Sequence, residues 1–435
     1  MSTTESSTAD WAVPANRAPA DTSFVRFLKT LGPGLLFAST AIGVSHLVQS
    51  TRAGAGYGYA LLWAIVIANL LKYPAFESAP RYTNATGESL IDGYLRLGKW
   101  MLYVYLLITI APLFIINAAI GFTTAGLLNN LLGLDLSAAT TALFLLAVCV
   151  GVLLAGEYSL LDNLIKIICV VLFVSTIVAF VLTLARGPVA TVPFYSSDIW
   201  TASGFAFLIA LMGWMPAPVD LSAWNSLWTL ERIKQTAYRP RMSETLLDFK
   251  LGYLMTAFLA VCFMTLGAFI MYGSGQSFSN QSGTQFTNQV VQLYTATLGD
   301  WSYIIIAASA FSVMFSTTLV VLDGYARAME RTCALLFWSG QHSRRMYNLW
   351  VIISAVGAYW MIAQFLTSFT TLVDLATIIS FLVAPILAAA NYKLVCGASM
   401  PQDARPPDWL RCLGIIGIVF LSVFSLLYAA MRLLA

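Results

Sequence analysis

The sequence predicts an all-α polytopic membrane protein, and two observations support this. Of the 435 residues, 59% are hydrophobic and only 10% are charged, whereas a soluble domain has about a quarter charged residues. The apolar residues form repeated runs of about 20 residues, the length at which a helix crosses a bilayer. An outer-membrane barrel would instead show alternating strands of about ten residues.

Residues 1–23 precede the first apolar run and are rich in Ser, Thr and Ala. They mix charges of both signs and lack the apolar core of a signal peptide, so we expect a disordered cytoplasmic tail. Residues 24–435 then form a single transmembrane domain. The six cysteines are scattered singly, which indicates neither a disulfide framework nor a zinc site.

The apolar runs predict eleven membrane helices, near 30–55, 58–79, 100–128, 137–156, 161–186, 202–228, 250–273, 302–326, 347–367, 370–393 and 411–433. Most lysines and arginines lie in the segments that share a side with the N-terminus. This asymmetry predicts a cytoplasmic N-terminus and, with an odd number of spans, an external C-terminus. We therefore expect a multi-pass protein of the cell (inner) membrane.

The first and sixth predicted spans are each interrupted near mid-membrane. The first contains the segment GVSH at 43–46, and the sixth contains Pro216 and Pro218, which remove two backbone donors from one turn. Two broken helices five spans apart indicate a transporter built from inverted repeats, whose site lies where the breaks meet. The repeats would cover about 30–186 and 202–393, with an added helix at 411–433.

The sequence around the first break, GPGLLFASTAIGVSHLVQSTRAGAGYGYALLW, resembles the Nramp family of divalent metal-ion transporters. That family reads GP, then DPGN, then GA-x-x-GY-x-LLW, and carries MPH in its sixth span. Met215 and Pro216 match the last of these motifs. The resemblance covers the chain from about residue 30. It implies a LeuT-type fold with 5+5 inverted repeats, transport by alternating access and no enzyme activity.

Carried over by position, the resemblance gives an altered site. The family's metal-binding Asp falls on Gly43 and its metal-binding Asn on His46, so that DPGN has become GVSH. Its Met ligand is kept as Met215, and MPH has become MPA. The third span, 100–128, lacks the family's acidic residues. The substrate-binding residues that we expect are Gly43, Val44, Ser45, His46, Met212, Met215 and Ala217.

Three kinds of cargo remain open. A small anion such as bicarbonate or a short carboxylate is our first expectation, because broken helices expose half-helix N-termini whose N–H groups favour negative charge. A divalent transition-metal ion is the family default, and His46 with Met215 would offer it a soft ligand pair. A small organic solute is the third.

Other polar residues at membrane depth are candidates for gating or coupling. These are Asp220, Glu77, Ser316 and Thr317. The two hydroxyls would suit Na⁺ as coupling ion, as in sodium-coupled carriers of the LeuT type. We expect the bilayer and a small ion as partners, and neither a cofactor nor a nucleic acid. The sequence shows neither a nucleophile–base constellation nor a Gly-rich phosphate loop, which argues against an enzyme.

Overall fold

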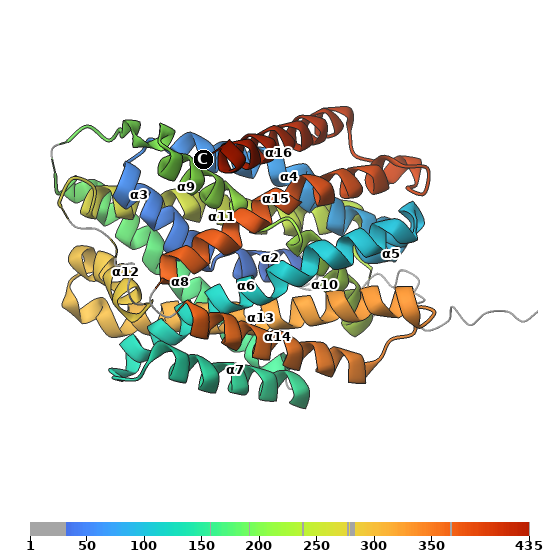
Figure 1. Ribbon diagram of the computed structural model, residues 1–435, viewed down its shortest axis with the longest axis horizontal. Coiled ribbons are helices and arrows are strands. Elements are labelled where there is room, and N and C mark those ends of the chain that lie inside the picture. The colour runs from blue at the N-terminus through green and yellow to red at the C-terminus, as the bar shows by residue number, and fades with distance from the viewer. Residues whose placement is uncertain are drawn as a thin grey trace, which may run out of the picture.

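The computed structural model describes residues 32–156, 158–190, 192–236, 239–275, 278, 283–365 and 368–434. The described chain is almost entirely helical (Figure 1), which confirms the predicted all-α class. The tail predicted at 1–23 lies outside these residues. The elements, in chain order, are α2 (Pro33–Ala41), η2 (Ser45–Ser50), α3 (Thr51–Tyr57), α4 (Leu62–Thr86), α5 (Leu90–Leu97), α6 (Lys99–Leu132), α7 (Ala138–Ala155), α8 (Tyr158–Arg186), η3 (Ser197–Trp200), α9 (Ala202–Gly213), α10 (Leu221–Thr236), α11 (Met242–Ile270), α12 (Gly283–Leu298), η4 (Asp300–Ser302), α13 (Tyr303–Phe337), α14 (Arg344–Gln364), α15 (Phe369–Cys396), η5 (Gln402–Ala404) and α16 (Asp408–Leu434).

Each of the two interrupted runs forms short helices instead of one continuous helix, as the sequence predicts. The first span consists of α2 followed by the π-helix η2 and by α3, and the sixth consists of α9 and α10. Among the described residues, seven helices are by themselves long and apolar enough to cross a membrane: α6, α7, α11, α13, α14, α15 and α16.

Two helices outside the apolar runs were not expected. Helix α5 is short and amphipathic, and Ser89 and Asp92 form a capping box at its start. Helix α12 lies between α11 and α13 and contains many polar residues. A search for long apolar runs misses both because neither has the length or composition of a membrane span.

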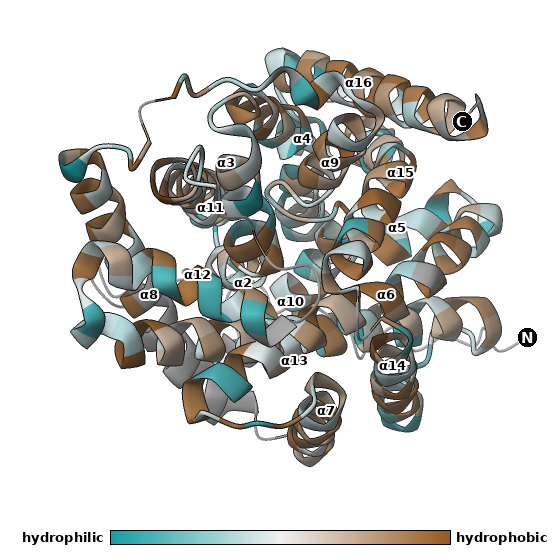
Figure 2. Ribbon diagram, turned by 60° about the vertical axis from the view of Figure 1, so that its left-hand side comes forward, coloured by the Kyte–Doolittle hydropathy of each residue, from teal (hydrophilic) through white to brown (hydrophobic). Residues whose placement is uncertain are grey.

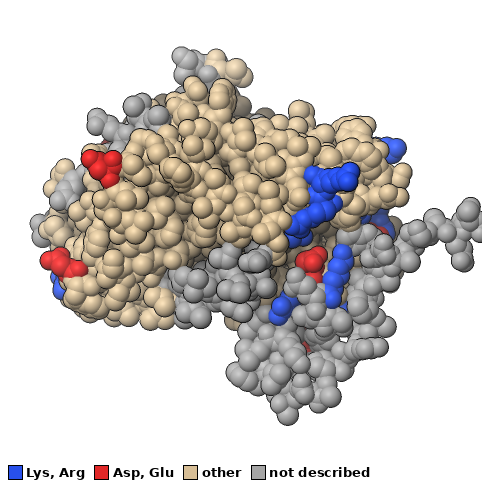
Figure 3. Space-filling model, turned by 90° about the horizontal axis from the view of Figure 1, so that it is seen from below, with Lys and Arg blue, Asp and Glu red and all other residues tan. Residues whose placement is uncertain are grey.

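The periphery of the bundle is apolar. Large side chains such as Phe144 of α7, Trp360 of α14 and Leu426 of α16 are exposed, and Figure 2 shows apolar residues along most of the length of these helices. Figure 3 shows a broad face almost without charge, with Lys and Arg gathered mainly on one side. Such a surface suits a bilayer. The orientation of the termini stays a prediction.

The broken spans lie inside the bundle. Helix α2 packs against α11 and α13, while α9 packs against α15, and α10 packs against α4. At Gly54 of α3, an added Cβ would overlap the carbonyl oxygen of Met264 in α11. Only glycine allows so close an approach of two helix backbones, so the sequence fixes the half-helix α3 tightly against α11.

Candidate functional site

The first break covers residues 42–44, between α2 and η2. Here the carbonyl oxygen of Gly43 accepts from the backbone N–H groups of His46 (3.1 Å) and Leu47 (3.0 Å), which begin the next half-helix. A Cβ on Gly43 would lie 3.1 Å from Cγ2 of Thr317 in α13. The break is therefore narrow, and the carboxylate that the family resemblance implies is replaced by a hydrogen atom.

The second break covers residues 214–220, between α9 and α10. It contains Pro216 and Pro218, and the Met215–Pro216 peptide bond is cis. Met215 is buried, and its sulfur accepts a hydrogen bond from Oγ of Ser50 at 3.7 Å. This contact links the second break to η2, so the two breaks meet as predicted from inverted repeats.

A small cavity lies where the breaks meet. Its volume is about 30 Å³, room for one or two water molecules. The lining carries hydroxyl groups, tryptophan rings and aliphatic groups, with no charged side chain among the described residues that form it. These residues are Thr40, Ala41, Val44, Ser45, Ile116, Ile120, Trp214, Ala217, Pro218, Leu221, Trp224, Thr317 and Val321.

Trp224 of α10 lines this cavity and carries an unpaired donor. Its side chain is fully buried, and its ring packs edge-to-face on Tyr325 with centroids 4.4 Å apart. In the described part of the chain, its Nε1–H has no hydrogen-bond partner. By contrast, Nε1 of Trp214 donates to Oγ of Ser380 at 2.9 Å. A buried N–H without a partner calls for an acceptor such as a water or a bound ligand.

His46 is fully buried but points away from the cavity, toward α11. Its Nε2 lies 2.8 Å from the carbonyl oxygen of Thr256, and its Nδ1 lies 2.7 Å from Oγ of Ser45. Because a carbonyl oxygen only accepts, Nε2 carries a hydrogen and donates it. The Ser45 hydroxyl also lies 2.6 Å from the carbonyl oxygen of Ala41. Because the hydroxyl has one hydrogen, it donates either to this carbonyl oxygen or to Nδ1 of His46 at any one time.

Lys72 of α4 reaches the second break. It is fully buried, and its ammonium donates to the carbonyl oxygens of Met212 (2.6 Å), Gly213 (2.7 Å) and Ala217 (3.4 Å). The Lys72 ammonium thus places a full positive charge against the carbonyl oxygens at the end of α9. Met212, which we expected to bind cargo, offers its carbonyl oxygen to Lys72.

Asp220 ends the second break, directly before α10. Its Oδ2 accepts from the hydroxyl of Tyr325 at 2.9 Å. Its Oδ1 is buried and has no hydrogen-bond partner among the described residues. Lys72 binds the carbonyl oxygen of Ala217 in the same break, so two opposite charges lie at this break.

Thr317 of α13 lies beside the first break, and Ser316 precedes it in the same helix. Thr317 donates to the carbonyl oxygen of Val313 at 2.9 Å and also lies 3.4 Å from the carbonyl oxygen of Ser39 in α2. Oγ of Ser316 is buried without a hydrogen-bond partner in the described part.

Glu77 lies away from the breaks. Its carboxylate accepts from Arg81 one turn along α4, at 2.6 and 2.9 Å, and Arg81 also donates to the carbonyl oxygen of Ala404. Arg81 therefore links α4 to the segment before α16, and Glu77 binds the same guanidinium group. Its predicted gating role stays untested.

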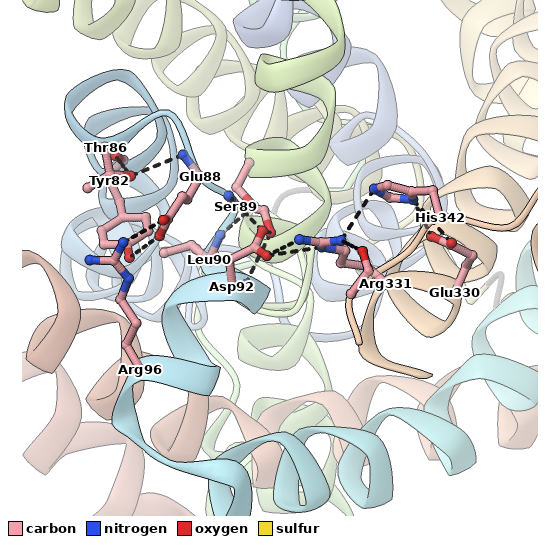
Figure 4. A network of polar contacts seen from close by, with 12 residues as sticks. Tyr82, Thr86, Glu88, Ser89, Leu90, Asp92, Arg96, Glu330, Arg331 and His342 are labelled. Carbon is pink, nitrogen blue, oxygen red and sulfur yellow. Dashed lines mark hydrogen bonds and ion pairs between the residues drawn. The ribbon is translucent and has the colours of Figure 1, made fainter. Parts of the chain in front are cut away.

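Charged contacts lie on both sides of the site. Arg52 of α3 binds Asp374 of α15 through two hydrogen bonds, at 2.6 and 3.1 Å. On the side where α2 begins, Figure 4 shows Asp92 of α5 facing Arg331 of α13, with His342 beyond it next to Glu330. These contacts link α3 to α15 and α5 to α13.

The sequence reasoning did not assign Lys72, Trp214 or Trp224 to the site. An ionisable residue inside a membrane span is by default a functional candidate, and this signal was present for Lys72. The two tryptophans flank the prolines of the second break, but tryptophan is also common at membrane interfaces. In the described part of the chain, no three His, Cys, Asp or Glu side chains are placed to hold a metal ion.

Two interrupted helices that meet at a buried cavity inside a helical bundle define a membrane transporter of the LeuT type. Solved structures share this fold. The manganese transporter of Eremococcus coleocola superposes with a TM-score of 0.73, covering 97% of this chain and 90% of that one at 13% identity. MhsT in complex with L-phenylalanine gives 0.61, covering 92% and 98% at 13% identity.

Sequence comparison gives the family. Residues 34–430 match the family described as "Natural resistance-associated macrophage protein-like", or Nramp. The chain is also 35% identical over 407 residues to "Uncharacterized protein PM0681" of Pasteurella multocida (strain Pm70), covering 92% of each. The chain belongs to the Nramp family, and it is a multi-pass transporter and not an enzyme.

Proposed function

We propose that this chain is a secondary transporter whose cargo is a small anion of the carboxylate or bicarbonate type. The observation that carries the proposal is Trp224, which lines a cavity without an acidic side chain and whose buried Nε1–H has no hydrogen-bond partner among the described residues. A divalent cation at membrane depth needs anionic or several oxygen ligands. An anion needs hydrogen-bond donors, and Trp224 offers one that no protein group uses.

The lining favours a short carboxylate over bicarbonate. Its hydroxyl groups come from Thr40, Ser45 and Thr317, and the rest of the wall is aliphatic or aromatic. A carboxylate with an apolar body would place its carbon atoms against this wall, whereas bicarbonate is polar throughout. Apolar pockets with few placed polar groups recognise ligands in this way.

The metal alternative lacks a ligand set in this conformation. Both ring nitrogens of His46 are engaged, one with Ser45 and one with the Thr256 carbonyl. Met215 alone offers a thioether, a weak ligand without an anionic partner. One of the solved relatives is named a manganese transporter, so manganese is the cation to test.

Purified protein in proteoliposomes would test the proposal. We expect saturable uptake of labelled formate, acetate or bicarbonate, and no manganese influx reported by an entrapped metal-sensitive dye. Trp224→Phe keeps the ring and removes the N–H, so it should raise the KM for the anion about tenfold. Trp214→Phe is the matched control, because its N–H already has a protein acceptor. Manganese uptake without anion uptake would contradict the proposal.

Sodium coupling is a further part of this proposal, supported by the unpaired Oγ of Ser316 next to Thr317. An inward Na⁺ gradient should then stimulate anion uptake, and Ser316→Ala should remove the stimulation while leaving basal flux. Equal uptake with Na⁺ and with choline would show that the anion moves without it.

A further inference from the structure

The surroundings of Lys72 are unusual for a lysine in a membrane span. Its side chain is fully buried, and the acceptors described for its ammonium are three backbone carbonyl oxygens, of Met212, Gly213 and Ala217. No carboxylate forms an ion pair with it in the described part of the chain. The three N–H bonds of the ammonium match the three carbonyl oxygens.

These carbonyl groups have the properties of a cation site. Helix α9 ends at Gly213, and the last carbonyl groups of a helix lack intrahelical donors and carry partial negative charge. Pro216 and Pro218 follow within the break, and neither has an N–H to donate. In transporters with discontinuous helices, such carbonyl ends bind the coupling cation.

We propose that the end of α9 is a cation site that Lys72 fills from within. The ammonium is covalently tethered, so it provides the positive charge of this site but cannot be released on the other side of the membrane. No free cation is then bound or released at this position during a transport cycle. The inference concerns the cation site and holds whichever cargo the central cavity takes.

The charge of the tethered ammonium is partly balanced. Asp220 lies in the same break as the Ala217 carbonyl group that Lys72 binds, and its Oδ1 has no hydrogen-bond partner in the described part. If a free cation of the same charge replaced the ammonium, Asp220 would balance its charge to the same extent. A monovalent ion or a small alkylammonium fits this requirement, whereas a divalent ion would leave an excess of positive charge.

Chemical rescue tests the proposal. Lys72→Ala removes the ammonium and leaves space beside the carbonyl groups, so we expect a lower melting temperature of the purified protein and at least about tenfold slower transport. Methylammonium, ethylammonium or Na⁺ should restore both in a saturable way. Lys72→Met is the matched control, because its side chain fills the space without charge. It should be impaired and should not respond to added cations.

The outcome is informative without knowledge of the cargo, since the melting temperature reports on the cation site and anion uptake reports on the proposed function. If Lys72→Ala does not fold, Lys72→Gln keeps N–H donors without a full charge, and we expect a folded protein with at least about tenfold slower transport. Transport at the level of the unchanged protein in Lys72→Gln, or a Lys72→Ala variant that no cation stabilises, would overturn the proposal.

Discussion

The two helix breaks differ in what holds them. The first is neutral: glycine contacts fix α3 to α11, and Ser45 and His46 link η2 to the carbonyl groups of Ala41 and Thr256. The second is charged, because Lys72 binds the carbonyl end of α9 and Asp220 lies before α10. The family resemblance instead implies an acidic residue at the first break.

This difference bears on what a transporter of this fold can carry. Close backbone packing keeps a break in shape without any charge, so the first break tolerates the loss of a carboxylate. The second break holds a positive charge that cannot leave, because the Lys72 ammonium is covalently attached to α4. At short range the tethered ammonium disfavours a second cation at the carbonyl end of α9, since Coulomb interactions are strong where water is excluded.

The largest effect is expected at the neutral break. Gly54→Val should prevent folding, or cost about 3 kcal/mol or more, because its Cβ would overlap the backbone of Met264 and Ala268. Gly56 lies in the same helix with open space around it, and Gly56→Ala should keep stability or raise it by up to about 1 kcal/mol. Yield and thermal unfolding of both variants measure this, and a stable Gly54→Val would show that α3 is not held by α11.

The next effect concerns the charged break. Asp220→Asn removes the negative charge that balances Lys72, and Lys72→Met removes the positive charge that balances Asp220. We expect the double variant to be less destabilised than the sum of the single variants, with a coupling free energy of about 1–3 kcal/mol. Unfolding of the four proteins gives this value. Additive effects would show that the two charges act independently.

A smaller effect should separate His46 from the cavity lining. His46→Ala removes the contact with Thr256, so it should cost about 1–2 kcal/mol of stability while the KM for the anion stays the same. Ser45→Ala, on the cavity wall, should raise that KM. Kinetics and unfolding measured on both variants test this. A KM that changes only in His46→Ala would place the histidine at the cargo.

The smallest effect is expected at the Arg52–Asp374 pair, because it is partly exposed. Arg52→Gln should cost about 1 kcal/mol or less of stability but shift the conformational equilibrium toward a cavity open on that side. Faster thiol labelling of Val44→Cys in the Arg52→Gln background measures the shift. Equal labelling rates would show that the pair does not hold the conformation closed.

The fold was predictable because its signals are local. Apolar runs mark the helices, and glycine and proline mark the two breaks. The direction of His46 was not predictable, because η2 is a π-helix whose wider turn rotates the side chains that follow Gly43. The partners of Lys72 were also hidden, since they are carbonyl groups about 140 residues along the chain, and no side-chain type marks them.

The central claim is that the cavity takes an anion and that Lys72 already fills the cation position at the end of α9. Isothermal titration calorimetry of the purified, unchanged protein tests this most directly, with short carboxylates and manganese titrated separately. We predict saturable heat from a carboxylate, reduced in Trp224→Phe, and none from manganese. Saturable manganese binding that is lost in Met215→Ala, with no carboxylate binding, would contradict the account.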